Sequence, residues 1–239
     1  MKKTILISGA TSDLAGDVIN RLKKKYNLVL LYRKQFKDLS EKNKNINHIK
    51  YDYSERSQKN LIRQLEKNKI IISSMLHFNG VHSFSTINSI SADEFRKVYE
   101  ANCFTFIKLI KLIKLSSSFD SLKSVLTISS VSSMHGNKGI TLYSSSKAAL
   151  NNIVKSFALE LSKKKIRVNS IILGHIQKGM GLKTTNFLNE HQIKFLEEKH
   201  PLGFGNAEDL FHSIDFLIDT KKSRWITGTN FILDGGYLI

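Results

Sequence analysis

Cysteine and proline are almost absent from this sequence of 239 residues, which contains one of each, Cys103 and Pro201. A single cysteine excludes an intramolecular disulfide and any cysteine-rich zinc site, and it fits a reducing compartment. No stretch approaches the roughly 20 apolar residues of a membrane-spanning helix. The apolar run in the opening MKKTILISGA covers only residues 5–7, too few for a signal peptide. We therefore expect a cytoplasmic protein.

Acidic residues are also scarce: Asp and Glu number 20 against 37 Lys and Arg, so the formal net charge is +17. The basic residues are mostly lysine and lie in scattered short runs, such as 23–25 and 163–165. A nucleic-acid interface instead needs a clustered patch, in which arginine reads bases and phosphates better than lysine does. We expect a solvated surface and no nucleic-acid partner, although the charge can attract an acidic partner or an anionic substrate by long-range steering.

Linkers and internal repeats are missing as well, so we expect one domain over residues 1–239. Short apolar runs alternate with segments of helical periodicity. The expected strands are 4–8, 28–32, 46–52, 70–78, 124–129, 167–173 and 225–236, and the expected helices are 13–24, 61–68, 93–115 and 143–163. This alternation predicts an α/β fold, a doubly wound parallel sheet with helices on both faces. The segment 179–205 interrupts the alternation and is the expected substrate lid.

The helix expected at 93–115 contains FIKLIKLIKL, with a lysine every three residues at Lys108, Lys111 and Lys114. A basic amphipathic helix can lie on a membrane surface. Apolar residues surround this helix almost completely, which is more typical of a buried helix or a subunit contact. We favour the second interpretation and expect no membrane partner.

The first expected strand ends in a turn at Gly9, and a helix begins near Asp13. In a doubly wound sheet such a turn holds a pyrophosphate, because backbone N–H groups and the positive helix end face the anion. The turn has few glycines: Asp13 and Ala15 occupy the later positions of a G-x-x-x-G-x-G pattern, and Gly16 comes one place late. Taken alone, the segment fits a plain strand–helix turn equally well.

Tyr143 and Lys147 are four residues apart in ITLYSSSKAAL, so a helix would place them one turn apart on the same face. They are either ordinary surface side chains or a proton donor beside a cation. An unperturbed tyrosine, with a pKa of about 10, is poorly matched to acid–base chemistry at neutral pH. A neighbouring ammonium favours the phenolate and lowers that pKa. We therefore expect Lys147 to lower the pKa of Tyr143 and to make it a proton donor and acceptor.

From Ile5 to Tyr237 the sequence resembles the short-chain dehydrogenase/reductase family of the classical type. The matching motifs occur in the family's order, which makes them strong evidence together. They are SGATSDLA at 8–15 for T-G-x-x-x-G-x-G, HFNG at 77–80 for N-N-A-G, the helix asparagine Asn102, the serine Ser130, Y-x-x-x-K at Tyr143 and Lys147, RVNSIILGHI at 167–176 and the ending WITGTNFILDGG at 225–236. The resemblance implies a Rossmann fold and an NAD(P)(H)-dependent oxidoreductase that reduces a carbonyl or oxidises an alcohol by hydride transfer.

The resemblance also implies roles for the matching residues. Tyr143 exchanges the proton, and Ser130 binds the carbonyl oxygen. Lys147 holds the nicotinamide ribose, and Asn102 positions a water that links Lys147 to solvent. The residues implied in cofactor binding are Gly9, Thr11, Ser12, Asp13, Leu14, Arg33, Asp52, Tyr53, Asn79, Gly80, Tyr143, Lys147, Gly174 and Ile176. No metal is expected. The structural alternatives are a turn-forming Ser130 and a surface or capping Asn102.

The residue after the second expected strand indicates the cofactor. An acidic group there binds the adenosine ribose hydroxyls of NAD, whereas a basic group suits the 2′-phosphate of NADP. LVLLYRKQ presents Arg33 and Lys34 and no acid. We favour NADP(H), with NAD(H) as the alternative, because Ser12 stands where many NADP-dependent members of the family carry arginine.

Two positions depart from the family's pattern. Leu173 replaces the proline of a P-G pair, and Lys178 stands where a threonine often contacts the nicotinamide carboxamide. Lys178 is therefore expected to change how the nicotinamide is bound and to place a charge near the substrate entrance.

The motifs leave the substrate open. By overall pattern the chain resembles 3-oxoacyl-acyl-carrier-protein reductases, and an acidic carrier protein would suit the basic surface. One alternative is a sugar or sugar-nucleotide oxidoreductase of surface polysaccharide biosynthesis, with Lys178 facing an anionic sugar. Another is a protein that senses NADP(H) without turnover. The resemblance further implies a homodimer or homotetramer, with the helices around Asn102 and Tyr143 in the contact.

Overall fold

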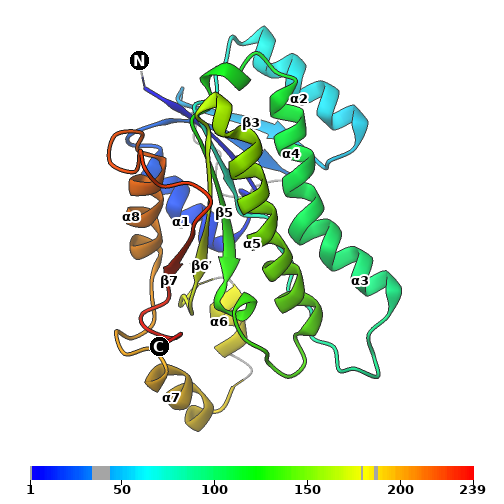
Figure 1. Cartoon of the computed structure of the whole chain (residues 1–239), viewed down its shortest axis with the longest axis vertical. Helices are drawn as coiled ribbons and strands as arrows, with labels where there is room; N and C mark the ends of the chain where they lie inside the picture. Colours follow the sequence, from blue (N-terminus) through cyan, green and yellow to red (C-terminus); the bar gives the residue numbers. More distant parts are fainter. Residues whose placement is uncertain (1, 34–43, 179, 186–187) are drawn as a thin grey trace.

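The computed structural model of the chain describes residues 2–33, 44–178, 180–185 and 188–239. Within these ranges, seven strands form one parallel sheet in the order β3-β2-β1-β4-β5-β6-β7 (Figure 1). The strands are β1 (Thr4–Ser8), β2 (Asn27–Tyr32), β3 (Ile46–Lys50), β4 (Ser74–His77), β5 (Ser124–Ser130), β6 (Arg167–Leu173) and β7 (Asn230–Leu233). The predicted α/β Rossmann fold is confirmed.

The sheet reverses its winding direction between β1 and β4. From β1 the chain moves outward to β2 and β3, then crosses back to β4 and continues to β7. At the reversal, Ser8 at the end of β1 is paired with His77 at the end of β4. A doubly wound sheet binds its ligands in the crevice that opens at this point, beyond the carboxyl ends of the strands.

Helices cover both faces of the sheet (Figure 1). The α-helices of the described residues are α1 (Asp13–Leu22), α2 (Glu55–Lys67), α3 (Ala92–Tyr99), α4 (Thr105–Lys114), α5 (Thr141–Leu161), α6 (Met180–Thr185), α7 (Glu190–Glu198) and α8 (Ala207–Ile218). α1 and α8 enclose an apolar core on one face, and α2, α4 and α5 enclose a second core on the other. Because both faces are covered, the central strands carry apolar side chains at successive positions.

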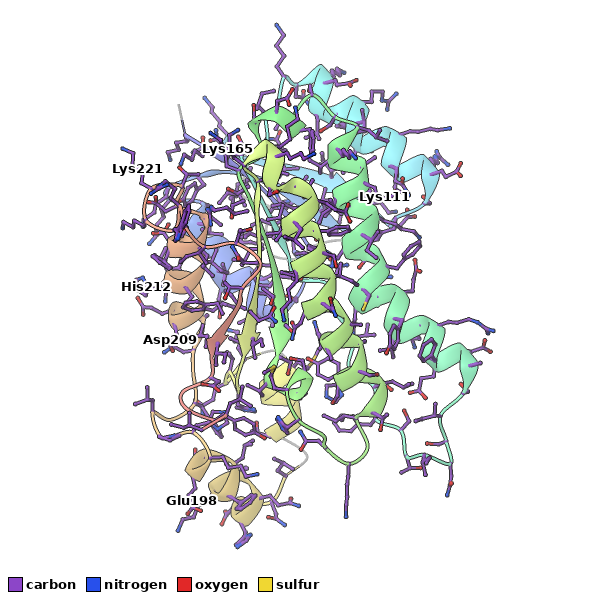
Figure 2. All side chains as sticks on the ribbon, viewed as in Figure 1. Lys111, Lys165, Glu198, Asp209, His212 and Lys221 are labelled. Carbon is purple, nitrogen blue, oxygen red and sulfur yellow. The ribbon has the colours of Figure 1, made fainter. Side chains whose placement is uncertain are left out.

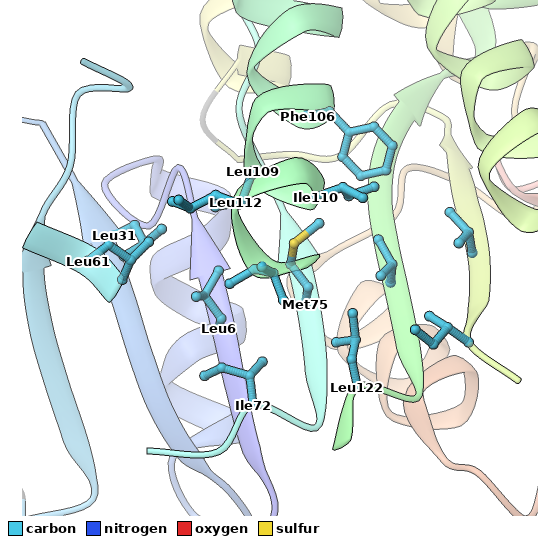
Figure 3. Packing of buried hydrophobic residues seen from close by; sticks show 14 of the residues in the cluster. Leu6, Leu31, Leu61, Ile72, Met75, Phe106, Leu109, Ile110, Leu112 and Leu122 are labelled. Carbon is cyan, nitrogen blue, oxygen red and sulfur yellow. The ribbon is translucent and has the colours of Figure 1, made fainter. Parts of the chain in front are cut away.

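α4 is the helix of the FIKLIKLIKL segment, and its apolar side is buried. Phe106 and Leu109 are 0% exposed, and they lie over Leu6 and Met75 of the sheet (Figure 3). Lys111 projects from the outer side of the helix (Figure 2). Nowhere in the described ranges is a helix long and apolar enough to span a membrane. The buried interpretation of this segment is confirmed.

The single helix predicted at 93–115 is interrupted. α3 and α4 are joined by a π-helical turn, Glu100–Phe104, that contains Asn102. A π turn inserts an extra residue into the helix and occurs frequently at functional sites. Apolar spacing on either side stays helical, so the sequence pattern does not reveal the turn.

The sequence prediction omits α8, which begins at a capping box. Asn206 Oδ1 accepts a hydrogen bond from Asp209 N at 3.3 Å, and Asn206 N donates to Asp209 Oδ2 at 2.8 Å. The helix predicted from Leu61 begins instead at Glu55, after the N-cap Ser54. The strands predicted at 70–78 and 225–236 shorten to β4 and β7. Apolar periodicity marks the buried part of an element, whereas capping residues determine where a helix begins.

The segment predicted as a lid, 179–205, contains α6 and α7, and its two flanks are tied together. Ile176 and Gly205 form an isolated parallel bridge. Gln177 N donates to Gly205 O at 3.1 Å, and Gly205 N donates to His175 O at 3.0 Å. α7 lies beyond the carboxyl edge of the sheet (Figure 1). Its function as a lid stays a prediction.

Candidate active site

The turn after β1 brings the N-terminus of α1 to the crevice. Gly9 has a φ of +70°, and a Cβ there would lie 2.7 Å from the backbone nitrogen of Asn79, so a larger residue would force a shift. Ser12 caps α1 by accepting a hydrogen bond from Ala15 N at 3.2 Å. The other residues predicted in this turn are the exposed Thr11 and Asp13 and the half-buried Leu14. The positive end of α1 is therefore open to an anion at the reversal of the sheet.

Asn102 is held in the π turn with 0% exposure. Its Oδ1 accepts a hydrogen bond from Val81 N at 2.7 Å, and its Nδ2 donates to Val81 O at 3.1 Å. Nδ2 also donates to Ser146 Oγ at 2.8 Å. The Asn102 amide therefore ties the loop after β4 to α5. The predicted alternative of a surface or capping asparagine is wrong.

Lys147 and Asn102 meet at Gly80, the glycine of HFNG. A Cβ at Gly80 would lie 3.2 Å from Lys147 Nζ and 3.5 Å from Asn102 Oδ1. Lys147 is 4% exposed, and its Nζ donates to Ile128 O at 2.8 Å. Burial lowers the pKa of Lys147 to about 8. This ammonium is charged at neutral pH but close to its titration, which suits a group that passes a proton on.

Tyr143 lies one turn earlier on α5, on the same face as Lys147. Lys147 Nζ is 5.9 Å from the centroid of the Tyr143 ring. Burial raises the pKa of Tyr143, and the Ser130 hydroxyl opposes that shift. The prediction that Lys147 lowers this pKa is therefore wrong here: the ammonium bonds to a backbone carbonyl, and desolvation, which disfavours the phenolate, has the larger effect. The predicted spacing and shared face are confirmed.

Ser130 ends β5 with its hydroxyl toward Tyr143. The same hydroxyl accepts a hydrogen bond from Ser132 N at 3.2 Å and so caps the short 3₁₀ turn Val131–Ser133. Ser133 Oγ donates to Ser130 O at 2.6 Å. Ser130 is therefore a turn former and a neighbour of Tyr143 at once, so the structural and functional interpretations are compatible.

The residues after β6 form the wall opposite α1. A Cβ at Gly174 would lie 2.6 Å from Asp234 Cα, so the glycine permits close approach of the two chain segments. Ile176 is buried, at 5% exposure. Lys178 Nζ lies 3.0 Å from Asp17 Oδ2 of α1. The charge predicted near the substrate entrance is thus paired with an acid on α1.

Arg33 and Asp52 mark the far end of the crevice, after β2 and β3. Both are exposed, and Lys34 lies outside the described residues. Asp52 Oδ1 accepts hydrogen bonds from Ser54 N at 3.0 Å and from Ser54 Oγ at 2.6 Å. These bonds lower the pKa of Asp52 to about 2, so it is an anion at neutral pH. No described contact joins Arg33 to Asp52.

Tyr53, next to Asp52, is a core residue rather than part of an open surface. Its φ is +67°, and its ring is 8% exposed with its centroid 4.6 Å from that of Tyr51. Burial raises the pKa of Tyr53 to about 12, and the hydroxyls of Ser8 and Thr105 oppose that shift. Little of Tyr53 is therefore available to a ligand.

His77 forms a buried polar network under the crevice that the sequence analysis missed. Its Nδ1 lies 2.7 Å from Ser8 Oγ, and its Nε2 lies 3.3 Å from Thr105 Oγ1. Burial lowers the pKa of His77 to about 3, with a smaller effect from the charge of Lys147. The neutral imidazole therefore links the carboxyl ends of β1 and β4 to α4.

The crevice residues fit a dinucleotide. Asn79 Oδ1 is buried without a hydrogen-bond partner, so a ligand hydroxyl or amide would satisfy it. Gly9 and Gly80 leave open the space that Cβ atoms would fill. Across the described ranges, no three His, Cys, Asp or Glu side chains are grouped in a way that could hold a metal ion.

His82 is a second residue that the sequence analysis missed. Its ring centroid lies 4.4 Å from that of Tyr143, with 30° between the ring planes. The ring centroid of Phe84 lies 4.3 Å from that of His82. The available signal was a histidine two positions after HFNG, but the sequence does not show that this loop folds over α5.

Comparisons with known proteins identify the family of the chain. The chain matches the family described as enoyl-(acyl carrier protein) reductase over residues 25–238. It is 29% identical over 246 residues to the 3-oxoacyl-[acyl-carrier-protein] reductase FabG of Rickettsia conorii, covering 99% of this chain and 97% of that protein.

Solved structures with the same fold include proteins with bound nicotinamide cofactors. A 4-hydroxyisoleucine dehydrogenase complexed with NADH has a TM-score of 0.86 at 28% identity, over 99% of this chain and 98% of the other. ElxO with NADP bound shares the fold, with a TM-score of 0.86 at 24% identity, over 100% of this chain and 99% of the other. The family match covers β2 to β7, and with them Ser130, Tyr143 and Lys147. The chain therefore belongs to the short-chain dehydrogenase/reductase family of NAD(P)-dependent oxidoreductases.

Proposed function

We propose that this enzyme reduces a carbonyl compound with NADPH, or oxidises the corresponding alcohol with NADP⁺, at Ser130, Tyr143 and Lys147. The observation that supports the proposal is the convergence of these side chains, with Asn102 behind them, at the crevice between β1 and β4. The bound nicotinamide supplies or accepts the hydride. The protein supplies the proton and orients the carbonyl.

Each side chain then has a distinct task. The Tyr143 hydroxyl gives its proton to the substrate oxygen, and Ser130 Oγ donates a second hydrogen bond to the same oxygen. Because burial raises the pKa of Tyr143, its hydroxyl stays protonated until a substrate arrives. Lys147, with a pKa of about 8, holds the nicotinamide ribose and restores the proton to Tyr143. Asn102 positions the water that connects Lys147 to solvent.

The cofactor would lie along the carboxyl edge of the sheet. We assign its diphosphate to the N-terminus of α1, where Gly9 and the exposed 11–13 segment leave backbone N–H groups open. Asp52 and Tyr53 would hold its adenine, and Asn79 and Gly80 would bind ribose hydroxyls. Gly174 and Ile176 would hold its carboxamide.

The preference for NADP(H) rests on Arg33. This exposed guanidinium follows β2 without an acid in described contact, so it is available to a 2′-phosphate as a charge-assisted hydrogen-bond donor. Asp52 is engaged by Ser54 and lies after β3 instead of β2. NAD(H) is the alternative, because Ser12 uses its hydroxyl to cap α1 and offers no charge.

For the substrate, we propose a 3-oxoacyl group, carried on an acyl carrier protein. The support is the full-length similarity to the Rickettsia reductase and the net charge of +17, which would attract an acidic carrier. The sugar alternative drew on Lys178 and the altered lid, and the charge of Lys178 is paired with Asp17. The sensor alternative would not explain why Tyr143 and Lys147 are buried side by side, because a protein without turnover needs no proton donor.

We further propose a homodimer or homotetramer in which the π turn and α5 contribute to the contact. Large apolar side chains are exposed there: Phe104 is 45% exposed and Leu159 is 77% exposed. The segment 179–205 would act as the lid, hinged where Ile176 meets Gly205. Light scattering tests the assembly, and a monomer at micromolar concentration would contradict it.

A cofactor-oxidation screen tests the function. The purified enzyme is mixed with NADPH, or in parallel with NADH, and with simple ketones, acetoacetyl thioesters or nucleotide sugars with an oxidised ring carbon. We expect the fastest loss of absorbance at 340 nm with acetoacetyl thioesters and NADPH. Turnover only with nucleotide sugars would replace the substrate proposal. Binding of NADPH without oxidation by any carbonyl compound would instead support the sensor.

A further inference from the structure

The ring of His82 contacts the rings of both Phe84 and Tyr143. The centroid distances are 4.3 Å to Phe84 and 4.4 Å to Tyr143, with 38° and 30° between the ring planes. Phe84 is 69% exposed, whereas Tyr143 is 8% exposed. His82 therefore contacts both the buried ring of Tyr143 and an exposed aromatic side chain.

The loop that carries His82 is fixed on both sides of it. Before it, Val81 is held by the Asn102 amide through its N–H and its C=O. After it, Ser83 Oγ and Ser85 Oγ both donate to Glu94 Oε1, at 2.5 and 3.0 Å.

A backbone contact adds a further anchor, because Ser85 N donates to Gly139 O at 2.8 Å in the loop before α5. A side chain between such anchors loses little further freedom when it binds a ligand.

The two nitrogens of the His82 ring are in different surroundings. Nδ1 is buried without a hydrogen-bond partner, and burial lowers the pKa of the ring, so it is neutral at physiological pH. A buried N–H without an acceptor is rarer in proteins than an unpaired acceptor. The tautomer that avoids this cost carries its proton on Nε2. Nε2–H is thus a hydrogen-bond donor beside Tyr143.

We propose that His82 is a specificity-determining residue that donates a hydrogen bond to a second carbonyl oxygen of the substrate, near the carbonyl that Tyr143 protonates. This inference rests on the proposed function and makes it narrower. A dicarbonyl substrate can place one oxygen at Tyr143 and Ser130 and the other at His82. A simple ketone leaves the His82 donor unused.

Two variants separate the donor from the ring. His82→Phe keeps an aromatic ring beside Phe84 and Tyr143 but removes both ring nitrogens. His82→Gln replaces the ring by an amide that carries a donor at a similar distance from the backbone. His212→Phe is the matched control, because His212 is an exposed histidine on the outer side of α8 (Figure 2).

The experiment measures kcat and KM for an acetoacetyl thioester and for an unsubstituted methyl ketone of similar length, together with NADPH binding by fluorescence. For His82→Phe we expect a loss of about fivefold to tenfold in kcat/KM with the thioester, mainly through KM, as for a lost neutral hydrogen bond. The methyl ketone and NADPH binding should change less than about twofold. His82→Gln should retain part of the preference for the thioester, and His212→Phe should retain all of it.

The possible outcomes are distinct. Equal losses on both substrates, or no loss with His82→Phe, would refute the role of His82 and leave the oxidoreductase proposal intact. A His82→Gln enzyme that loses as much selectivity as His82→Phe would also refute it, because the donor would then be irrelevant. Failure of the unmodified enzyme to reduce any carbonyl compound would overturn the proposed function and this inference together.

Discussion

The two ends of the crevice are built differently. At the catalytic end, Asn102 is 0%, Lys147 4% and Tyr143 8% exposed. Their polar groups are tied to the backbone of distant segments, as in the bond from Lys147 Nζ to Ile128 O. At the adenosine end, Arg33 and Asp52 are exposed, and the described hydrogen bonds of Asp52 go to Ser54 and Ser57, within five residues of it.

This difference indicates which properties can vary independently. A buried group whose partners come from β4, β5 and α5 cannot change without disturbing all three elements. An exposed arginine at a strand end can be replaced at little structural cost. The chemistry of this enzyme is therefore built into its core, whereas its choice of cofactor depends on surface residues.

The largest effect should come from the catalytic end. Tyr143→Phe removes the hydroxyl and keeps the buried ring, so we expect turnover to fall by about a thousandfold, the scale of a lost general acid. NADPH binding, followed by fluorescence, should stay within about twofold. Tyr26→Phe is the control, because the Tyr26 hydroxyl bonds to Asp215 on the opposite face. Substantial turnover by Tyr143→Phe would mean that another group supplies the proton.

Asn102→Ala should show that the catalytic end of the crevice also stabilises the fold. It leaves Val81 N and O without their partner, so we expect a loss of about 2–3 kcal/mol in the free energy of unfolding. Urea titration measures it. Asn152→Ala, at an exposed position on α5, should cost less than about 0.5 kcal/mol. Equal stability of the two variants would remove the distinction between the buried and exposed ends.

Arg33→Ala tests the adenosine end. A lost charge partner for the 2′-phosphate should weaken NADPH binding by about tenfold or more, while NADH binding changes little. The free energy of unfolding should stay within about 0.5 kcal/mol because the side chain is exposed. Arg224→Ala, which also removes an exposed arginine, should affect neither cofactor. Equal weakening of NADPH and NADH would contradict the NADP assignment.

The smallest effect should come from Asp17→Asn. Its partner Lys178 lies 3.0 Å away, but the two side chains are 38% and 44% exposed. Partly exposed ion pairs contribute about 0–1 kcal/mol, so we expect a shift of less than about 0.5 kcal/mol in urea titration. Steady-state turnover should change less than twofold. A much larger loss of turnover would show that the pair holds the nicotinamide wall in place.

Much of this arrangement was predictable from local patterns. The apolar runs predict β1, β2 and β6 almost to the residue, because buried parallel strands need continuous apolar side chains. The spacing of Tyr143 and Lys147 predicts their shared face on α5. The π turn at Asn102 was missed because it depends on hydrogen bonds that apolar spacing does not report. The helix α8 was missed although its buried residues, from Leu210 to Ile218, follow helical spacing.

The sequence by itself determined the seven strands and their alternation with helices, the helix face shared by Tyr143 and Lys147, and the family to which the chain belongs. Tertiary structure alone decided the rest. It raised the pKa of Tyr143, contrary to expectation, and brought His82 against its ring. It also paired Lys178 with Asp17. The physical reason is that desolvation and side-chain contacts depend on segments that are distant in the chain, and no local pattern encodes where those segments meet.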